Sequence, residues 1–155
     1  MPSNLPEIEK ILVETFHRTS HNLAVIHAEL KPVGYRFFKH PLVKPLSNTK
    51  ELLQQLDNAI EPFGFVPLSL KMFYSIVGSV DFRWNYESYP SILWEKADPI
   101  EIGGLKCLVE ECTDKDYVEQ LAEECEEEGF ISLMLAADYL TKDNISGGGR
   151  PMRVK

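Results

Sequence analysis

The sequence predicts an α+β domain in which N-terminal helices are followed by a mixed or antiparallel sheet flanked by helices. Its 155 residues are 44% hydrophobic and 26% charged, a size and composition typical of one globular domain. Apolar residues recur at helical spacing through the first half, whereas alternating apolar and polar residues appear after Ser79. Helices that precede a cluster of strands are characteristic of the α+β class.

The first helix is predicted from Asn4, a candidate N-cap, to the region of Pro32 and Gly34. The polar pair at 19–20 leaves a break in this helix open. After it, residues 35–46 are expected to be irregular with one short edge segment, because prolines restrict strand length there. The apolar positions that define the helical face are Ile8, Leu12, Phe16, Leu23, Ile26 and Leu30.

Two further helices are predicted in the middle of the chain. Ser47 or Asn48 caps the first of them, which runs to about Ile60. Pro67 leads into the second, and Gly78 follows it where a left-handed residue is favoured. The short connection predicts that the two helices are close neighbours.

The second half is predicted to contain most of the strands. Val80, Phe82 and Trp84 alternate with polar residues, as in a half-buried strand. Residues 99–102 and 105–109 are interpreted as two strands joined by a Gly103–Gly104 hairpin turn. A helix capped by Thr113 or Asp114 follows and ends at Gly129. A strand is expected over 130–136, and a short one could end the tail over 145–154.

The net charge of −8, from 24 acidic and 16 basic residues, favours a basic partner and disfavours nucleic acid. No apolar run approaches the roughly 20 residues that span a bilayer, and the N-terminus lacks the pattern of a secretory signal. The three cysteines are irregularly spaced, which is typical of reduced thiols. We therefore expect a cytoplasmic protein with no membrane association.

Three patterns were considered for chemistry. Glu14, His17 and His21 could share a helical face as metal ligands, but the H-E-x-x-H arrangement is absent and further ligands would come from afar. Cys107 has no histidine partner nearby in sequence. The glycines at 147–149 are followed by Arg-Pro rather than the Lys-Ser/Thr of a P-loop. We expect no catalytic residue, metal or cofactor, and hence no enzyme; a metal-dependent hydrolase is the least favoured alternative.

Acidic residues cluster near the end of the helix that follows Asp114. Carboxylates at a helix C-terminus oppose the helix dipole and repel one another, so another factor should favour them. That factor could be a cationic partner surface or simply solubility. The cluster comprises Glu123, Glu124, Glu126, Glu127 and Glu128.

Aromatic residues concentrate between 82 and 94, where both tryptophans of the chain lie. Tyr and Trp are enriched at interface hot spots, although they are also common in cores. Trp84 is in phase with the buried strand positions and is assigned to the core, whereas the later aromatics are assigned to the surface. The tentative partner-binding residues are Tyr86, Tyr89, Trp94, Glu123, Glu124 and Glu127.

The segment Leu56–Phe82 resembles the signature of the SUKH superfamily, which includes cell-wall-assembly regulators and bacterial immunity proteins. That signature is a helix, a turn, a helix of the form P-x-x-x-K-x-F-Y, a glycine and a strand; here it is Pro67 to Tyr74, followed by Gly78. The stretch Asp138–Gly148 is also similar to bacterial proteins related to that group. Ser79 departs from the pattern, which has a second glycine there.

The resemblance implies one SUKH-like domain over 1–155, with 1–46 as an N-terminal helical extension. It implies a mixed sheet flanked by helices and a role in protein binding, often the neutralisation of a toxin, with no catalytic residues. An acidic immunity protein could cover the basic surface of a nuclease toxin. An intracellular scaffold or regulator that binds several partners is the alternative, because fold alone does not decide function.

Overall fold

The computed structural model describes residues 4–85, 87–88, 101–133 and 135, and within them the fold is α+β. Helices α1 (Leu5–Leu30), α2 (Thr49–Ile60), α3 (Leu68–Ile76), α4 (Leu105–Thr113) and α5 (Lys115–Glu128) surround a small sheet. The strands are β1 (Leu42–Val43), β2 (Ser79–Asp81) and β3 (Glu101–Ile102). None of these helices combines the length and hydrophobicity that crossing a membrane requires.

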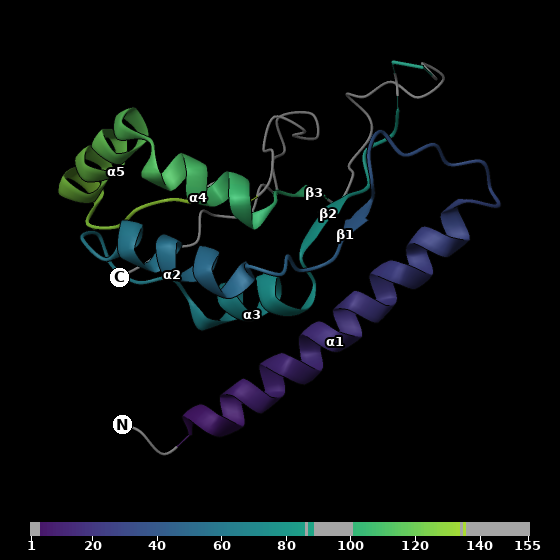
Figure 1. The fold of residues 1–155 in the computed structure, drawn as a ribbon, viewed down its shortest axis with the longest axis horizontal. Helices are drawn as coiled ribbons and strands as arrows, with labels where there is room; N and C mark the ends of the chain where they lie inside the picture. The colour runs from purple at the N-terminus through teal and green to yellow at the C-terminus, as the bar shows by residue number, and fades with distance from the viewer. Residues whose placement is uncertain (1–3, 86, 89–100, 134, 136–155) are drawn as a thin grey trace.

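The helices form a stack that begins with α1, which packs on α3 (Figure 1). Helix α3 contacts α2, α2 contacts α4, and α4 leads directly into α5 at the opposite side of the molecule (Figure 1). The rings of Phe16 on α1 and Phe73 on α3 meet edge to face with their centroids 5.9 Å apart. The acidic helix α5 is therefore separated from α1 by three other helices.

The sheet is antiparallel, with β2 in its centre. Val80 pairs with Leu42 on one side and with Ile102 on the other, and it is only 1% exposed. Beyond β2, Phe37 and Trp84 form an isolated bridge. The side chains of Val80, Phe82 and Trp84 are all buried, which confirms the predicted alternation and the core position of Trp84.

The predicted starts of two helices are confirmed. Helix α2 follows Asn48, and α3 follows Pro67. Gly78 has φ of +90° and leads from α3 into β2, so residues 56–82 have the expected order of helix, turn, helix, glycine and strand. A Cβ atom on Gly78 would lie 2.1 Å from the carbonyl oxygen of Val43, so this position also has no room for a side chain.

Helix α1 is continuous, so the possible break at Thr19 and Ser20 does not occur. The hydroxyl groups of Thr15 and Thr19 donate hydrogen bonds to the carbonyl groups of Ile11 and Thr15, one turn earlier. These bonds let polar residues remain inside the helix. The short edge segment expected within 35–46 is β1, which lies between Pro41 and Pro45.

The prediction of a hairpin with a second strand at 105–109 is wrong. Only the first strand exists, as β3, and residues 105–113 form helix α4. Gly104 is extended, with φ of −72° and ψ of 144°, and acts as the N-cap of α4. The buried residues of α4 follow a helical spacing that continues beyond the apolar run. They are Leu105, Leu108, Val109 and Cys112.

The core lies where the helices meet the sheet. Its fully buried side chains come from helices α2 to α5, from β2 and from the segment after α5. After α5, Ile131 and Leu133 are buried and Ile131 forms a single bridge, so residues 130–133 contain no strand element. The tail over 145–154 lies outside the described residues. The largest fully buried side chains are Tyr74, Leu56, Ile60, Leu121, Ile131, Val80 and Cys112.

Candidate protein-binding face

The best candidate site is a shallow acidic depression on α5, which we call the α5 face. Asp114 caps the start of α5. One of its carboxylate oxygens accepts hydrogen bonds from the backbone N–H groups of Asp116 and Tyr117, at 3.1 and 3.2 Å. Leu121 is 2% exposed and anchors the inner side of α5. All glutamates of the predicted cluster are exposed except Glu124, which is half-buried.

The chain reversal after α5 completes the depression. Gly129 has φ of +71°, and its N–H donates to the carbonyl group of Cys125 at 3.0 Å. Ile131 and Leu133 then point into the core, so Phe130 and Ser132 lie on the other side of this extended segment. The depression encloses about 540 Å³. Its lining residues are Gln120, Glu123, Glu124, Glu127, Glu128, Phe130 and Ser132.

The electrostatic character of the α5 face is strongly negative. Helix α5 contains seven carboxylates and a single lysine, Lys115. Lys115 is the first residue of the helix and lies 3.7 Å from Glu119. Its last turn has no basic residue. Among the described residues, no ion pair engages Glu123, Glu124, Glu127 or Glu128. Within the described part of the chain, these four carboxylates thus have no ion-pair partner.

The structure brings the predicted glutamates together around one depression. The predicted aromatic residues belong to a different segment of the chain. Tyr86, Tyr89 and Trp94 are outside the described residues. Glu123 and Glu127 are exposed, whereas Glu124 is half-buried against the helix. Sequence reasoning missed Phe130 and Ser132. The alternation of Phe130, Ile131, Ser132 and Leu133 behind a helix-ending glycine was the signal that could have identified them.

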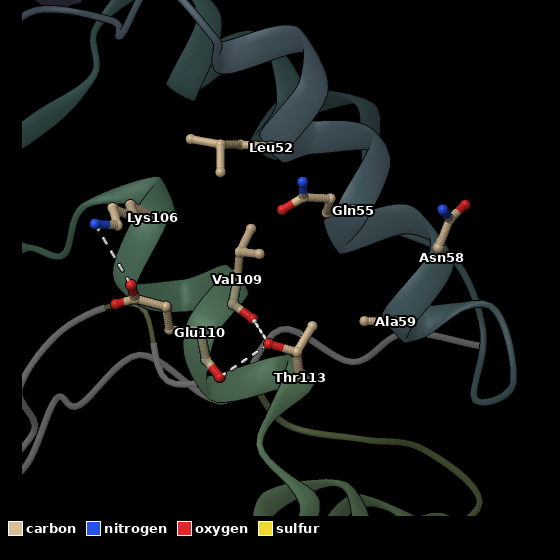
Figure 2. Close-up of a pocket in the computed structure, with 8 residues that line it drawn as sticks. All are labelled: Leu52, Gln55, Asn58, Ala59, Lys106, Val109, Glu110 and Thr113. Atoms are coloured by element: carbon tan, nitrogen blue, oxygen red, sulfur yellow. Dashed lines mark hydrogen bonds and ion pairs between the residues drawn. The ribbon is translucent and has the colours of Figure 1, made fainter.

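A second concave surface, which we call the α2–α4 groove, lies between these two helices (Figure 2). It encloses about 450 Å³ and has an apolar floor of Leu52, Ala59 and Val109. Its rim carries the ion pair of Lys106 with Glu110, at 3.6 Å, which runs along α4 (Figure 2). The groove could not be predicted while residues 105–109 were interpreted as a strand.

The polar groups of the α2–α4 groove are mostly committed to their own helices. The hydroxyl group of Thr113 donates to the carbonyl groups of Val109 at 2.8 Å and Glu110 at 3.1 Å (Figure 2). Asn58 accepts a hydrogen bond from Gln54 at 3.0 Å. Only Gln55 presents an amide group that no described hydrogen bond occupies. The groove is therefore suited to apolar contact more than to the binding of a charged ligand.

The residues considered for metal binding do not form a site. Glu14, His17 and His21 are exposed on α1, and Glu14 forms an ion pair with Arg18. The described part of the chain holds no group of three or more His, Cys, Asp or Glu side chains placed to bind a metal ion. His27, on the same helix, packs its ring against Phe37 with centroids 5.1 Å apart.

All three cysteines are free thiols. Cys107 is exposed and Cys125 is half-buried. Cys112 is fully buried, and this burial, together with nearby Glu111, raises the pKa of its thiol to about 11. A thiol with such a pKa is almost entirely protonated at neutral pH and is a poor nucleophile. Cys112 is therefore a core residue, and the glycines at 147–149 lie outside the described residues.

A half-buried cluster of charged side chains joins β2 and β3. Asp81 and Glu101 are paired across the strands, and Arg83 contacts Asp81 at 2.7 Å and Glu101 at 3.1 Å. Burial acts to raise the pKa of Asp81, but hydrogen bonds from Arg83 outweigh it and lower that pKa. The pKa of Glu101 is raised, chiefly by burial. Arg83 is shared by both carboxylates, so the cluster keeps a net charge of −1 while its ion pairs connect the two strands.

Comparisons with protein-family models, with curated proteins and with solved structures each found no match to this chain. The α5 face and the α2–α4 groove are therefore interpreted from the chemistry of their own residues. One surface is an array of carboxylates beside an aromatic ring, with no ion pair to another described residue, and the other is an apolar groove.

Proposed function

We propose that this chain is a protein-binding domain whose α5 face contacts a basic protein. The observation that carries the proposal is the set of four glutamates around one depression, without a described cation among them. Such an arrangement disfavours α5, because like charges three or four residues apart cost roughly 0.2–0.5 kcal/mol per pair. A complementary positive surface would relieve this repulsion and would guide encounter.

Phe130 supports a protein partner over a small cation. Phe130 is half-buried and lines the same depression as the carboxylates, so the depression combines charge with an aromatic wall. Lys and Arg side chains suit this combination, since their stems are apolar and their ends are charged. The partner surface expected here is thus rich in Lys or Arg.

An immunity protein that neutralises a basic toxin is the most specific form of the proposal. The resemblance of Leu56–Phe82 to the SUKH signature supports it, as does the net charge of −8. A toxin that acts on nucleic acid needs a basic surface to bind phosphate groups. An acidic protein that covers that surface would block the toxin by occupying it.

The proposal is tested with two charge-reversal variants of equal net charge. Glu123→Lys with Glu127→Lys alters the α5 face, and Glu29→Lys with Glu51→Lys alters exposed positions on α1 and α2. The tagged wild-type chain is used to isolate its partner from the source organism, and affinity is then measured at low and moderate salt. We expect the α5 variant to weaken binding at least about tenfold, because like charges across an interface are strongly unfavourable.

The control variant should bind nearly as tightly as the wild type, with the same loss of affinity as salt rises. Equal weakening by both variants would show that only net charge matters and would refute a specific α5 face. Co-expression distinguishes the immunity role: the wild-type chain should restore growth to cells that produce the partner, and the α5 variant should not.

The scaffold alternative is favoured by one observation, the separate α2–α4 groove with its apolar floor. A scaffold would use two surfaces for different partners. If unrelated partners compete for the α5 face, or if a second partner binds while the α5 face is occupied, the chain is a scaffold rather than a dedicated immunity protein.

A further inference from the structure

The C-terminal half of α1 is attached to the rest of the molecule by few side chains. After Ser20, only Leu23, His27 and Leu30 are not exposed. Their spacing of four and three residues places them on one side of the helix. Leu23 is the only buried residue of α1, and the other two are half-buried. Because two of the three side chains are aliphatic and the middle one is an imidazole, this attachment has a titratable group at its centre.

The ring of His27 lies against two aromatic rings beside the sheet. Its centroid is 5.1 Å from that of Phe37 and 6.5 Å from that of Phe82. Phe37 is bridged to Trp84. The hydroxyl group of Tyr35 donates to the carbonyl group of Phe82 at 2.6 Å. Figure 1 shows the end of α1 on the side of the molecule where the strands lie, away from α5. His27 is therefore part of the contact between α1 and the sheet region.

The charges that act on His27 are positive. Lys31 lies one turn further along the chain at the end of α1, and His40 belongs to the segment before β1. Burial, then Lys31 and then His40, lower the pKa of His27 below its ordinary value of 6.5. Arg36, which precedes Phe37, is a further cation on the same segment and is exposed. The surroundings thus favour the neutral imidazole over the imidazolium.

The acidic residues nearest to His27 in the helix and in the adjoining strand are directed elsewhere. Glu29 is exposed and only two positions from His27, and side chains with that separation on a helix do not face each other. Asp81 alternates with the buried Phe82, so it lies on the opposite side of the strand, where it pairs with Arg83 at 2.7 Å. Neither carboxylate is therefore placed to pair with a protonated His27.

We propose that His27 is a pH-sensitive joint: protonation of its imidazole releases the C-terminal half of α1 from the rings of Phe37 and Phe82. While α1 is attached, burial and the neighbouring cations keep the imidazole neutral. Once released, His27 takes up a proton as an ordinary histidine does. The attachment is therefore fully stable above about pH 6.5 and weakens as pH falls through the lower pKa of the attached form. Histidines that titrate in this range shift interfaces in other pH-sensitive proteins.

The effect should be confined to one end of the helix. The N-terminal half of α1 packs on α3, where Phe16 and Phe73 meet with their centroids 5.9 Å apart, and neither side chain titrates. Segments with few buried contacts open at a small free-energy cost, and the end of α1 has only Leu23 buried. Local release of this end therefore does not require that the core unfold.

Amide hydrogen exchange of the full chain tests the release, with each rate divided by the intrinsic rate at the same pH. Between about pH 7.5 and about pH 5.5, protection of residues 23–30 should fall several-fold relative to α2. The fall should not exceed about tenfold, because pH 5.5 is one unit below the ordinary pKa of 6.5. His27→Phe keeps a ring but cannot titrate, so its protection should not change with pH. His21→Gln, at an exposed position of α1, is the matched control and should behave like the wild type.

An NMR titration of the imidazole tests the electrostatic cause. The pKa of His27 should lie below 6.5 in the wild type, and Lys31→Gln should raise it because one like charge is removed. A pKa of His27 at or above 6.5, or tighter attachment of α1 at low pH, would overturn the proposal. So would an equal loss of protection in His27→Phe, or a loss shared by α1 and α2, since either would assign the titration to another group.

Discussion

Helices α4 and α5 are joined at Asp114, but they differ in how many of their side chains are buried. Helix α4 buries four residues of its nine, and it packs against α2 in the centre of the stack. Helix α5 is longer, with 14 residues, but buries only Leu121. One helix is held by its core contacts, and the other is held by its ends and one anchor.

If α5 binds a partner as proposed, this difference separates stability from recognition. The sequence of α4 is constrained by packing, because its apolar side chains fit into a dense core. The outer positions of α5 contact few other residues, so their identity can follow the needs of a partner. Carboxylates there lower helix stability, and the burial of α4 next to it compensates. The predictions that follow test this separation, from the largest expected effect to the smallest.

Leu108→Ala should give the largest loss of stability. Leu108 is buried in α4, and its truncation removes apolar contact and leaves a cavity, with an expected loss of about 2–5 kcal/mol. Urea unfolding followed by circular dichroism measures the change. Lys106→Ala, on the exposed side of the same helix, should change stability by less than about 0.5 kcal/mol. Similar losses in both variants would mean that α4 does not hold the core as described.

Asp114→Ala should have an intermediate effect, because it removes the two hydrogen bonds that cap α5. Loss of a helix N-cap costs about 0.5–2 kcal/mol, and Asp114→Asn should retain most of that stability. Thermal unfolding measures both variants. Because α5 has only one buried anchor, its N-terminal amides should also exchange faster in Asp114→Ala while those of α4 stay protected. Uniform loss of protection would contradict the separation between the two helices.

Much of this fold could be predicted from local signals, and the failures have a common cause. Helices α2 and α3 begin after Asn48 and Pro67, and α5 ends at Gly129, as the sequence predicts. Helix α4 was missed because Gly103–Gly104 is also typical of a hairpin turn. Its actual role depends on distant partners: the hydroxyl group of Tyr74 donates to the carbonyl group of Gly103 at 3.1 Å, and the Gly103 N–H donates to Leu135 at 2.9 Å.

The candidate site could likewise be predicted only where local sequence determines it. The glutamates of α5 are close in sequence, so one helix is enough to gather them. Phe130 joins them only because the chain reverses at Gly129 and then alternates about the buried Ile131. The α2–α4 groove needs two helices that are about 50 residues apart in the sequence, and no local pattern indicates that they meet.

Neutralisation of the last turn of α5 should slightly raise stability while it reduces binding. Glu127→Gln with Glu128→Gln removes carboxylates from a helix C-terminus, where each is unfavourable by roughly 0.3–1 kcal/mol at low salt and full exposure reduces this further. The stability gain should disappear as salt rises. Unfolding at two salt concentrations, together with binding to the isolated partner, measures both effects. A loss of stability would show that these glutamates have a structural role.

Glu101→Gln should give the smallest change in stability. It extends the comparison to a half-buried carboxylate. Burial raises its pKa above the ordinary value of 4.5, so the folded protein binds this proton more readily than the unfolded chain does. Its contribution to stability is therefore fully present below about pH 4.5 and is lost as pH rises through the folded value. Relative to Glu101→Gln, the wild type should gain stability as pH falls from 7 toward 5. Parallel pH profiles for the two proteins would contradict the raised pKa.

The close approach of Gly78 to Val43 draws attention to strand β1 and to whether another strand could pair with it. Strand β1 forms the outer edge of the sheet, yet it is only two residues long and is bounded by Pro41 and Pro45, which have no N–H group to donate. Strand β1 thus offers little backbone to which a foreign peptide could pair as an additional strand.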